Sequence, residues 1–155
     1  MKKVIKMALL FLACAFVAGM AACSDDDKND KDVIVSYEDI PQAAKTFIAT
    51  YYANTQVSRV ERDNDKGIIE YEVYFANRHD VTFNSAGEWI EVDAPEGEAI
   101  PNGIAMQPIV DYLAQNYADD GINDITRLQN GFEVDLIYGP DLLFDAQGNF
   151  VRIDR

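Results

Sequence analysis

Apolar residues recur at helical spacing near residue 40 and again near residue 109. In the first segment they fall at i, i+3, i+4, i+7, i+8 and i+11, which is typical of a helix that buries one face. That face comprises Ile40, Ala43, Ala44, Phe47, Ile48 and Tyr51. Asp39 with Gln42 is expected to form a capping box at its start. In the second segment Pro108 marks the expected start, and the face comprises Ile109, Tyr112, Leu113 and Tyr117.

After each predicted helix, apolar and polar residues alternate with the period of two that is typical of half-buried strands. Glycine, asparagine and proline interrupt the alternation and predict short hairpin turns. Strands are expected at 56–62, 69–76, 80–84 and 88–93, and again at 122–128, 132–138, 141–145 and 149–153. The stretch 94–103, rich in Pro, Gly and Glu, is the expected linker.

The second set of strands repeats the first when the chain is shifted by 61 residues. Residues 71–93 align with 132–154 without a gap, and matched Gly and Asp at the turns favour duplication over generic strand patterning. The identical positions are Glu72, Val73, Asp80, Phe83, Gly87 and Asp93. The sequence therefore predicts an α+β fold of two tandem α-β-β-β-β units, 38–94 and 95–155, with an antiparallel sheet or sheets and helices packed on one face.

The first 22 residues have the pattern of a secretory signal. Three lysines precede an apolar run from Met7 to Ala22, which is shorter than the ~20 apolar residues that a membrane-spanning helix needs. Cys23 follows small residues and resembles the modified cysteine of a bacterial lipobox, whereas cleavage before Cys14 would leave a very short apolar region. The sequence predicts a signal peptide at 1–22 and a lipid on Cys23. An ordinary signal peptide with an incidental cysteine, or a buried N-terminal helix, is the alternative.

Residues 24–32 contain no apolar side chain, and their dense charge predicts a disordered, extended tether within 23–37. An EF-hand reading fails, because Asp30 stands where the loop needs Gly and Ser36 where it needs Glu. The acidic residues after Cys23 also resemble a surface-export signal of some lipoproteins. Periplasmic and surface-exposed locations in the cell envelope therefore both stay open.

Composition narrows the function further. The chain has 13 Lys+Arg against 27 Asp+Glu, which argues against nucleic acid as a partner. Two Cys and one His exclude a disulfide scaffold, a four-cysteine zinc site and a centre with several histidines. His79 adjoins Arg78 in a turn and is expected to face solvent. With no nucleophile, metal set or phosphate loop in the sequence, we expect neither an enzyme nor a cofactor.

The lipobox, the acidic tether, the Ile-Pro-led helix and the paired strand blocks resemble the PepSY-like bacterial lipoproteins, also called β-lactamase-inhibitor-like (BLIP-like) proteins. The resemblance covers residues 38–155. It implies a membrane-anchored protein that binds, and in some relatives inhibits, an envelope or secreted protein such as a peptidase or a hydrolase. We expect a monomer.

The sheet face opposite the helices is the predicted binding surface. Aromatic side chains among charges suit a protein interface, because Trp, Tyr and Arg dominate binding hot spots. The candidate residues are Arg62, Glu72, Tyr74, Trp89, Asp135, Phe150 and Arg152. The alternative is that Trp89 and Phe150 pack inside the protein, because a register change of one residue exchanges the faces. A second candidate function is an accessory lipoprotein that binds glycans through Trp89 or Ca²⁺ through acidic turns.

Overall fold

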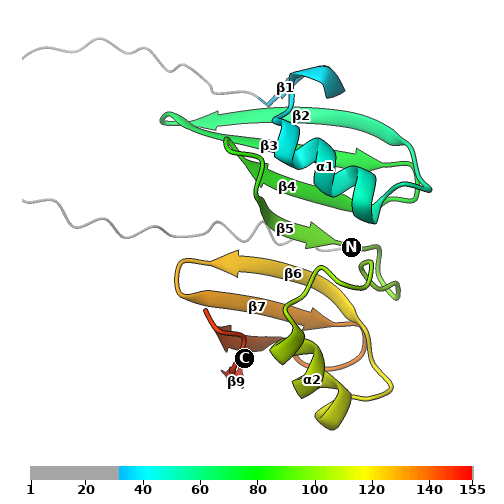
Figure 1. Ribbon diagram of the computed structural model, residues 1–155, viewed down its shortest axis with the longest axis vertical. Helices are drawn as coiled ribbons and strands as arrows, with labels where there is room; N and C mark the ends of the chain where they lie inside the picture. Colours follow the sequence, from blue (N-terminus) through cyan, green and yellow to red (C-terminus); the bar gives the residue numbers. More distant parts are fainter. Residues whose placement is uncertain (1–31, 155) are drawn as a thin grey trace, which may run out of the picture.

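The fold is known from a computed structural model that describes residues 32–154. Within this range nine strands form one antiparallel sheet, whose spatial order from β1 to β9 is the order of the sequence (Figure 1). The strands are β1 Val33–Ile34, β2 Val57–Asp65, β3 Ile68–Phe75, β4 Asp80–Asn84, β5 Trp89–Asp93, β6 Ile122–Leu128, β7 Gly131–Leu136, β8 Leu142–Asp145 and β9 Phe150–Ile153. The helices are η1 Tyr37–Asp39, α1 Gln42–Tyr51 and α2 Gln107–Asn116. The class is therefore α+β, as predicted, while the signal peptide and Cys23 lie outside the described residues.

A single ladder joins the two predicted sets of strands. β5 pairs with β6, with Val92 opposite Ile125, so the strands of both halves share one sheet. We call residues 33–94 the first half and residues 95–154 the second half. Both Val92 and Ile125 are fully buried, so the junction between the halves is part of the hydrophobic core.

Both helices lie in front of the sheet in Figure 1. Phe47 of α1 meets Phe83 of β4 edge-on, with 5.5 Å between ring centroids. In the same way Tyr112 of α2 meets Phe144 of β8 at 5.6 Å. We call this side of the sheet the helix side. Because side chains alternate along a strand, the neighbours of these buried residues point to the opposite face.

Two β-bulges interrupt the alternation at matching places. Thr82 pairs with Glu91, but the next residue, Phe83, pairs with Trp89, so Ile90 is an extra residue in β5. The register in β8 and β9 shifts in the same way and leaves Val151 as the extra residue. A bulge shifts every following side chain by one position relative to the partner strand. The shift turns the first residue of β5 and of β9 to the helix side.

The start of the described chain differs from the prediction. Val33–Ile34 pairs with β2 within the range predicted as tether, and a strand of two residues is too short for alternation to reveal. The capping box predicted for Asp39 and Gln42 is wrong. Asp39 instead accepts from the Ser36 backbone N–H at 3.0 Å and caps η1, while α1 starts after Pro41 without a side-chain cap.

The linker between β5 and α2 is fixed to β6 by one side chain. The amide Nδ2 of Asn123 donates to the carbonyl oxygens of Ala94, Pro95 and Glu98 at 3.0, 3.1 and 2.9 Å. The backbone N–H of Ile100 adds a bond to the Ile122 carbonyl at 2.9 Å. These contacts hold the linker beside the junction of the two halves.

Candidate functional site

Aspartates stand directly opposite one another across the middle of the face away from the helices. Cross-strand pairing joins Asp80 to Asp93, Asp93 to Asp124, and Asp124 to Asp135. We call these four residues of β4 to β7 the aspartate row. Directly opposite residues on neighbouring antiparallel strands lie about 5 Å apart, and like charges there destabilise the sheet. Because the row concentrates acidic side chains on one surface, it is a candidate functional feature.

A second row of acidic residues runs parallel to the first. It begins with Glu61 on β2 and then alternates between glutamate and threonine, in the order Glu72, Thr82, Glu91, Thr126 and Glu133. Leu143 and Arg152 continue the row on β8 and β9. We call the surface formed by the two rows the acidic face.

The environment of Asp124 favours a proton on its carboxyl group. Burial, together with the carboxylates of Glu91, Asp135 and Asp93, raises the pKa of Asp124 to about 8, while a hydrogen bond from Thr126 opposes the shift. The Thr126 hydroxyl lies 3.2 Å from the Asp124 carboxylate. A cation placed on this row would relieve the repulsion and release the proton.

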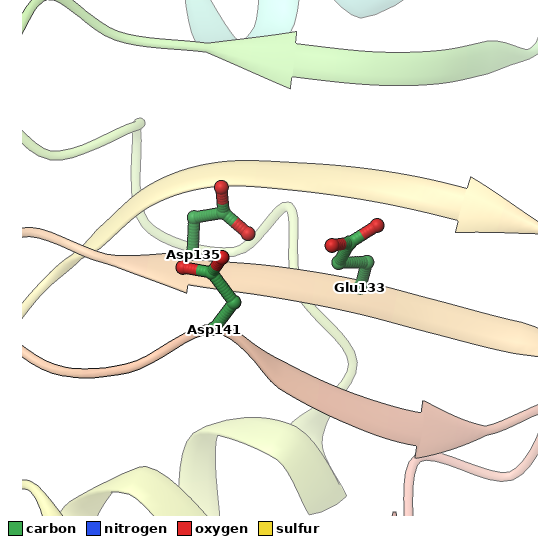
Figure 2. Close-up of side chains that lie close together, drawn as sticks. All are labelled: Glu133, Asp135 and Asp141. Atoms are coloured by element: carbon green, nitrogen blue, oxygen red, sulfur yellow. The ribbon is translucent and has the colours of Figure 1, made fainter. Parts of the chain in front are cut away.

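Three carboxylates of the second half converge at the edge of the row. Glu133 and Asp135 come from β7, and Asp141 comes from the residue before β8 (Figure 2). One oxygen from each lies within 4.8 Å of the others, and all three side chains are half-buried. Carboxylate oxygens are the ligands that Ca²⁺ prefers, so this acidic group has the chemistry to hold a hard cation.

The first-half end of the acidic face carries an aromatic ring. The Tyr74 hydroxyl donates to the Glu61 carboxylate at 3.1 Å, and the Arg59 guanidinium lies over the Tyr74 ring, 4.1 Å from its centroid. Arg59 also pairs with Glu61 at 3.2 Å. This end is therefore mixed in charge, whereas the middle of the face carries only acidic and hydroxyl side chains in its two rows.

Four of the seven predicted binding residues lie on the acidic face. They are Glu72, Tyr74, Asp135 and Arg152. Arg152 forms an ion pair with Asp154 at 2.8 Å and is well exposed. The structure therefore brings these four residues onto one surface, spread from β3 to β9.

The predicted face is wrong for Arg62, Trp89 and Phe150. Arg62 pairs with Tyr71, which packs against the core, so its side chain lies on the helix side. Phe150 stacks on Tyr112 of α2 with 4.5 Å between centroids. The β-bulges, which strand alternation does not reveal, account for Phe150 and Trp89.

Trp89 packs between the two halves on the helix side. Its ring lies 6.2 Å from that of Phe132, and the Arg127 guanidinium lies 4.4 Å from the Trp89 centroid. Arg127 therefore already occupies one face of this indole, which removes that face as a platform for a sugar ring.

His79 also differs from the prediction. It is only 6% exposed, whereas its place in a turn predicts a solvent-facing side chain.

Neither His79 nor the carboxylates of the acidic face line the hollows at the outer edge of the first half. The larger hollow holds about 660 Å³, and its lining includes Tyr37, Ile48 and Val57.

Sequence reasoning missed Asp93 and Asp124 as members of one row. No local signal in the sequence joins them, because the pairing of β5 with β6 is needed to place Asp93 beside Asp124. Two separate sheets would have kept these residues apart.

A family model described as "Putative beta-lactamase-inhibitor-like, PepSY-like" matches residues 27–72 and 69–152 of the chain. A search of curated proteins finds no match. Among residues 32–154, none of the helices has the length and apolar character needed to cross a membrane.

Solved structures of Bacteroides proteins share the fold. A "putative periplasmic protein" of the DUF2874 family from Bacteroides vulgatus is 31% identical, with a TM-score of 0.76, and the match covers 82% of this chain and 99% of that one. A "putative calcium-regulated periplasmic protein" from Bacteroides thetaiotaomicron is 31% identical, with a TM-score of 0.75 and coverage of 80% and 97%. A third, from Bacteroides vulgatus, is 28% identical, with a TM-score of 0.76 and coverage of 81% and 100%.

Proposed function

Because the chain belongs to the PepSY-like, β-lactamase-inhibitor-like family, we propose that it is a lipid-anchored cell-envelope protein that binds a cationic partner protein through its acidic face. In this proposal Cys23 carries the lipid, and the two halves are tandem α-β-β-β-β units with their helices on one side. The protein acts as a monomeric binding module, not as an enzyme. Its solved relatives, described as periplasmic, support a location in the envelope.

The aspartate row is the observation that carries this proposal. The row gathers acidic side chains on one surface, and a partner that brings lysine or arginine to it meets complementary charge. The sheet extends the row across four strands, so an extended cationic segment lying across the strands would contact several carboxylates at once. Complementary charge of this kind speeds association and selects the partner.

The family description supports a peptidase or another hydrolase as the class of partner. A protein that covers the active-site entrance of such an enzyme inhibits it by excluding substrate. Inhibition is therefore the second part of the proposal, and it is tested apart from binding.

The test compares two variants of the full chain that lose the same charge. The face variant carries Asp80→Asn, Asp93→Asn and Asp135→Asn, which are three members of the aspartate row. The control variant carries Glu96→Gln, Asp111→Asn and Asp119→Asn, which are exposed acids outside the acidic face. Each protein is titrated with a lysine-rich peptide and used to capture envelope proteins for mass spectrometry.

We expect the face variant to bind the peptide at least about tenfold more weakly than the wild type at low salt, and the control to bind like the wild type, because only the face variant reduces the local field. Captured proteins that the face variant loses and the control retains are then assayed for inhibited activity. Equal binding by the two variants would rule out the acidic face as the binding surface.

Calcium binding is the second candidate function. The convergence of Glu133, Asp135 and Asp141 favours it, and the relative described as calcium-regulated supports it. Millimolar CaCl₂ is expected to raise the melting temperature of the wild type by several degrees and that of the Glu133→Gln variant by much less. An equal shift with MgCl₂, or no shift in the wild type, would argue against a calcium site.

A further inference from the structure

The single histidine of the chain is buried where three elements meet. His79 lies in the turn between β3 and β4 and is 6% exposed. Tyr52, at the C-terminal end of α1, meets the imidazole edge-on at 5.7 Å between centroids and stacks on Phe75 of β3 at 4.1 Å. Aromatic rings thus hold His79 in place on one side.

The linker closes over the other side of His79. The Nε2 atom lies 3.8 Å from the Glu98 carboxylate, and the same carboxylate pairs with the Arg78 guanidinium at 3.3 Å. Glu98 belongs to the linker, and its backbone carbonyl oxygen accepts a hydrogen bond from the side-chain amide of Asn123 on β6. One short segment therefore connects the β3–β4 turn of the first half with the first strand of the second half.

The geometry around His79 suits the neutral imidazole. With a proton on Nε2 facing Glu98, the other nitrogen, Nδ1, is buried and has no hydrogen-bond partner among residues 32–154. Protonation would place an N–H donor there without an acceptor, and an unsatisfied buried donor is costly. The charged and titratable groups near the imidazole are Arg78, Glu98, Asp93 and Tyr52, together with the adjacent Asp80.

We propose that His79 and Glu98 form an acid-sensitive latch, in which neutral His79 keeps the linker 94–103 closed against the first half and protonation of His79 opens it. The latch goes beyond the proposed binding function, because it acts on the connection between the halves. Of the residues in the two acidic rows, only Asp80 and Asp93 lie near it. Opening would loosen the linker where it holds the start of β6.

Burial lowers the pKa of His79 from its ordinary value of 6.5, although Glu98 and Asp93 act in the opposite direction. The open form, with the imidazole in water, takes up a proton near pH 6.5, and the closed form does so only at lower pH. Closure is therefore fully favoured above pH 6.5 and weakens progressively as the pH falls below it. The sign is opposite to that expected for Asp124.

Because the chain has one histidine, its imidazole signal can be followed by NMR without assignment. The full-length protein is titrated from pH 7.5 to 4.5, and exchange of the Ala94 and Ile100 backbone N–H groups is measured in parallel. These two groups bond to the Asn123 and Ile122 carbonyls and report linker closure. We expect a histidine midpoint below 6.5 and, from pH 7 to pH 5, a rise in linker opening of up to about 25-fold after correction for intrinsic exchange.

The His79→Gln variant removes the titrating group and keeps a polar side chain. Its linker opening is expected to change by less than about twofold over the same range, while Arg78→Gln, which removes the neighbouring charge, keeps the steep dependence. If His79→Gln does not fold, the wild-type titration decides alone. A midpoint at or above 6.5, or linker protection that does not change between pH 7 and pH 5, would overturn the latch.

Discussion

The two halves share an order of elements but differ in charge and in how they are held. The first half contains five Lys and Arg against eleven Asp and Glu, whereas the second half contains two against eleven. His79 lies in the β3–β4 turn, and the residue 61 positions later is Pro140. The two halves therefore differ, with the buried histidine in the first half and the larger excess of acidic residues in the second.

Features that the halves keep in common are those that the packing demands. The bulges at Ile90 and Val151 and the glycines at 87 and 148 occupy matching positions. Features that differ include the buried His79, the strand β1 and the short helix η1, which belong to the first half. Equivalent substitutions in the two halves therefore separate structural needs from functional ones.

The largest difference in stability is expected at the matched glycines, which both have a positive φ. A Cβ on Gly87 (φ +83) would lie 2.8 Å from the Ala44 nitrogen and from the Pro41 Cβ, whereas on Gly148 (φ +80) the nearest atoms, from Ile109 and Pro108, lie 3.3 Å away. Gly87→Ala should lower the free energy of unfolding by about 3 kcal/mol and Gly148→Ala by about 1.5 kcal/mol. Urea denaturation measures both free energies of unfolding. Equal losses would show that α1 packs against the Gly87 turn as closely as α2 packs against the Gly148 turn.

An intermediate effect is expected at Asp124, and it depends on pH. The folded-state pKa of about 8 lies above the ordinary value of 3.8, so stability is fully present below about pH 4 and is lost as the pH rises through 8. Asp124→Asn should raise the free energy of unfolding at pH 8 by about 2 kcal/mol, allowing for solvent screening, and should have little effect near pH 4. Asp119→Asn, which removes an exposed charge in the same half, serves as the control. A pH-independent effect of Asp124→Asn would contradict crowding in the aspartate row.

The smallest effect is expected where an arginine covers an aromatic ring. Arg127 lies over Trp89 between the halves, and Arg59 lies over Tyr74 at the end of the acidic face. Arg127→Gln should lower the free energy of unfolding by about 1 kcal/mol, because a cation–π contact beside the core is lost. Arg59→Gln should cost about 0.5 kcal/mol, since Trp89 packs against the hydrophobic core whereas Tyr74 lies on the acidic face. Thermal denaturation at matched pH compares them, and a larger loss at Arg59 would contradict the assignment of Trp89 to the packed side.

Turn residues and alternation made much of the fold predictable. The strands β4 and β6 have the predicted bounds, and the Gly-containing turns near Gly67 and Gly148 separate strands as expected. Local sequence determines these features, because each turn needs a residue that tolerates its backbone angles. The start of α2 near Pro108 follows from the same kind of local rule.

The faces of individual side chains were less predictable. Ile90 and Val151 are apolar residues in apolar strands, so nothing in the alternation marks them as bulges. The burial of His79 depends on the linker that folds back over it, and the aspartate row depends on the pairing of β5 with β6. Both are contacts between segments whose relative position the local pattern does not define.

The strand order has a consequence for how the chain folds. Every ladder joins strands that are consecutive in the sequence. Loop closure is inexpensive for such near neighbours, and topologies rich in local contacts fold quickly. For a polypeptide that emerges from a narrow channel N-terminus first, each new strand would find its pairing edge already assembled, so the sheet can grow strand by strand.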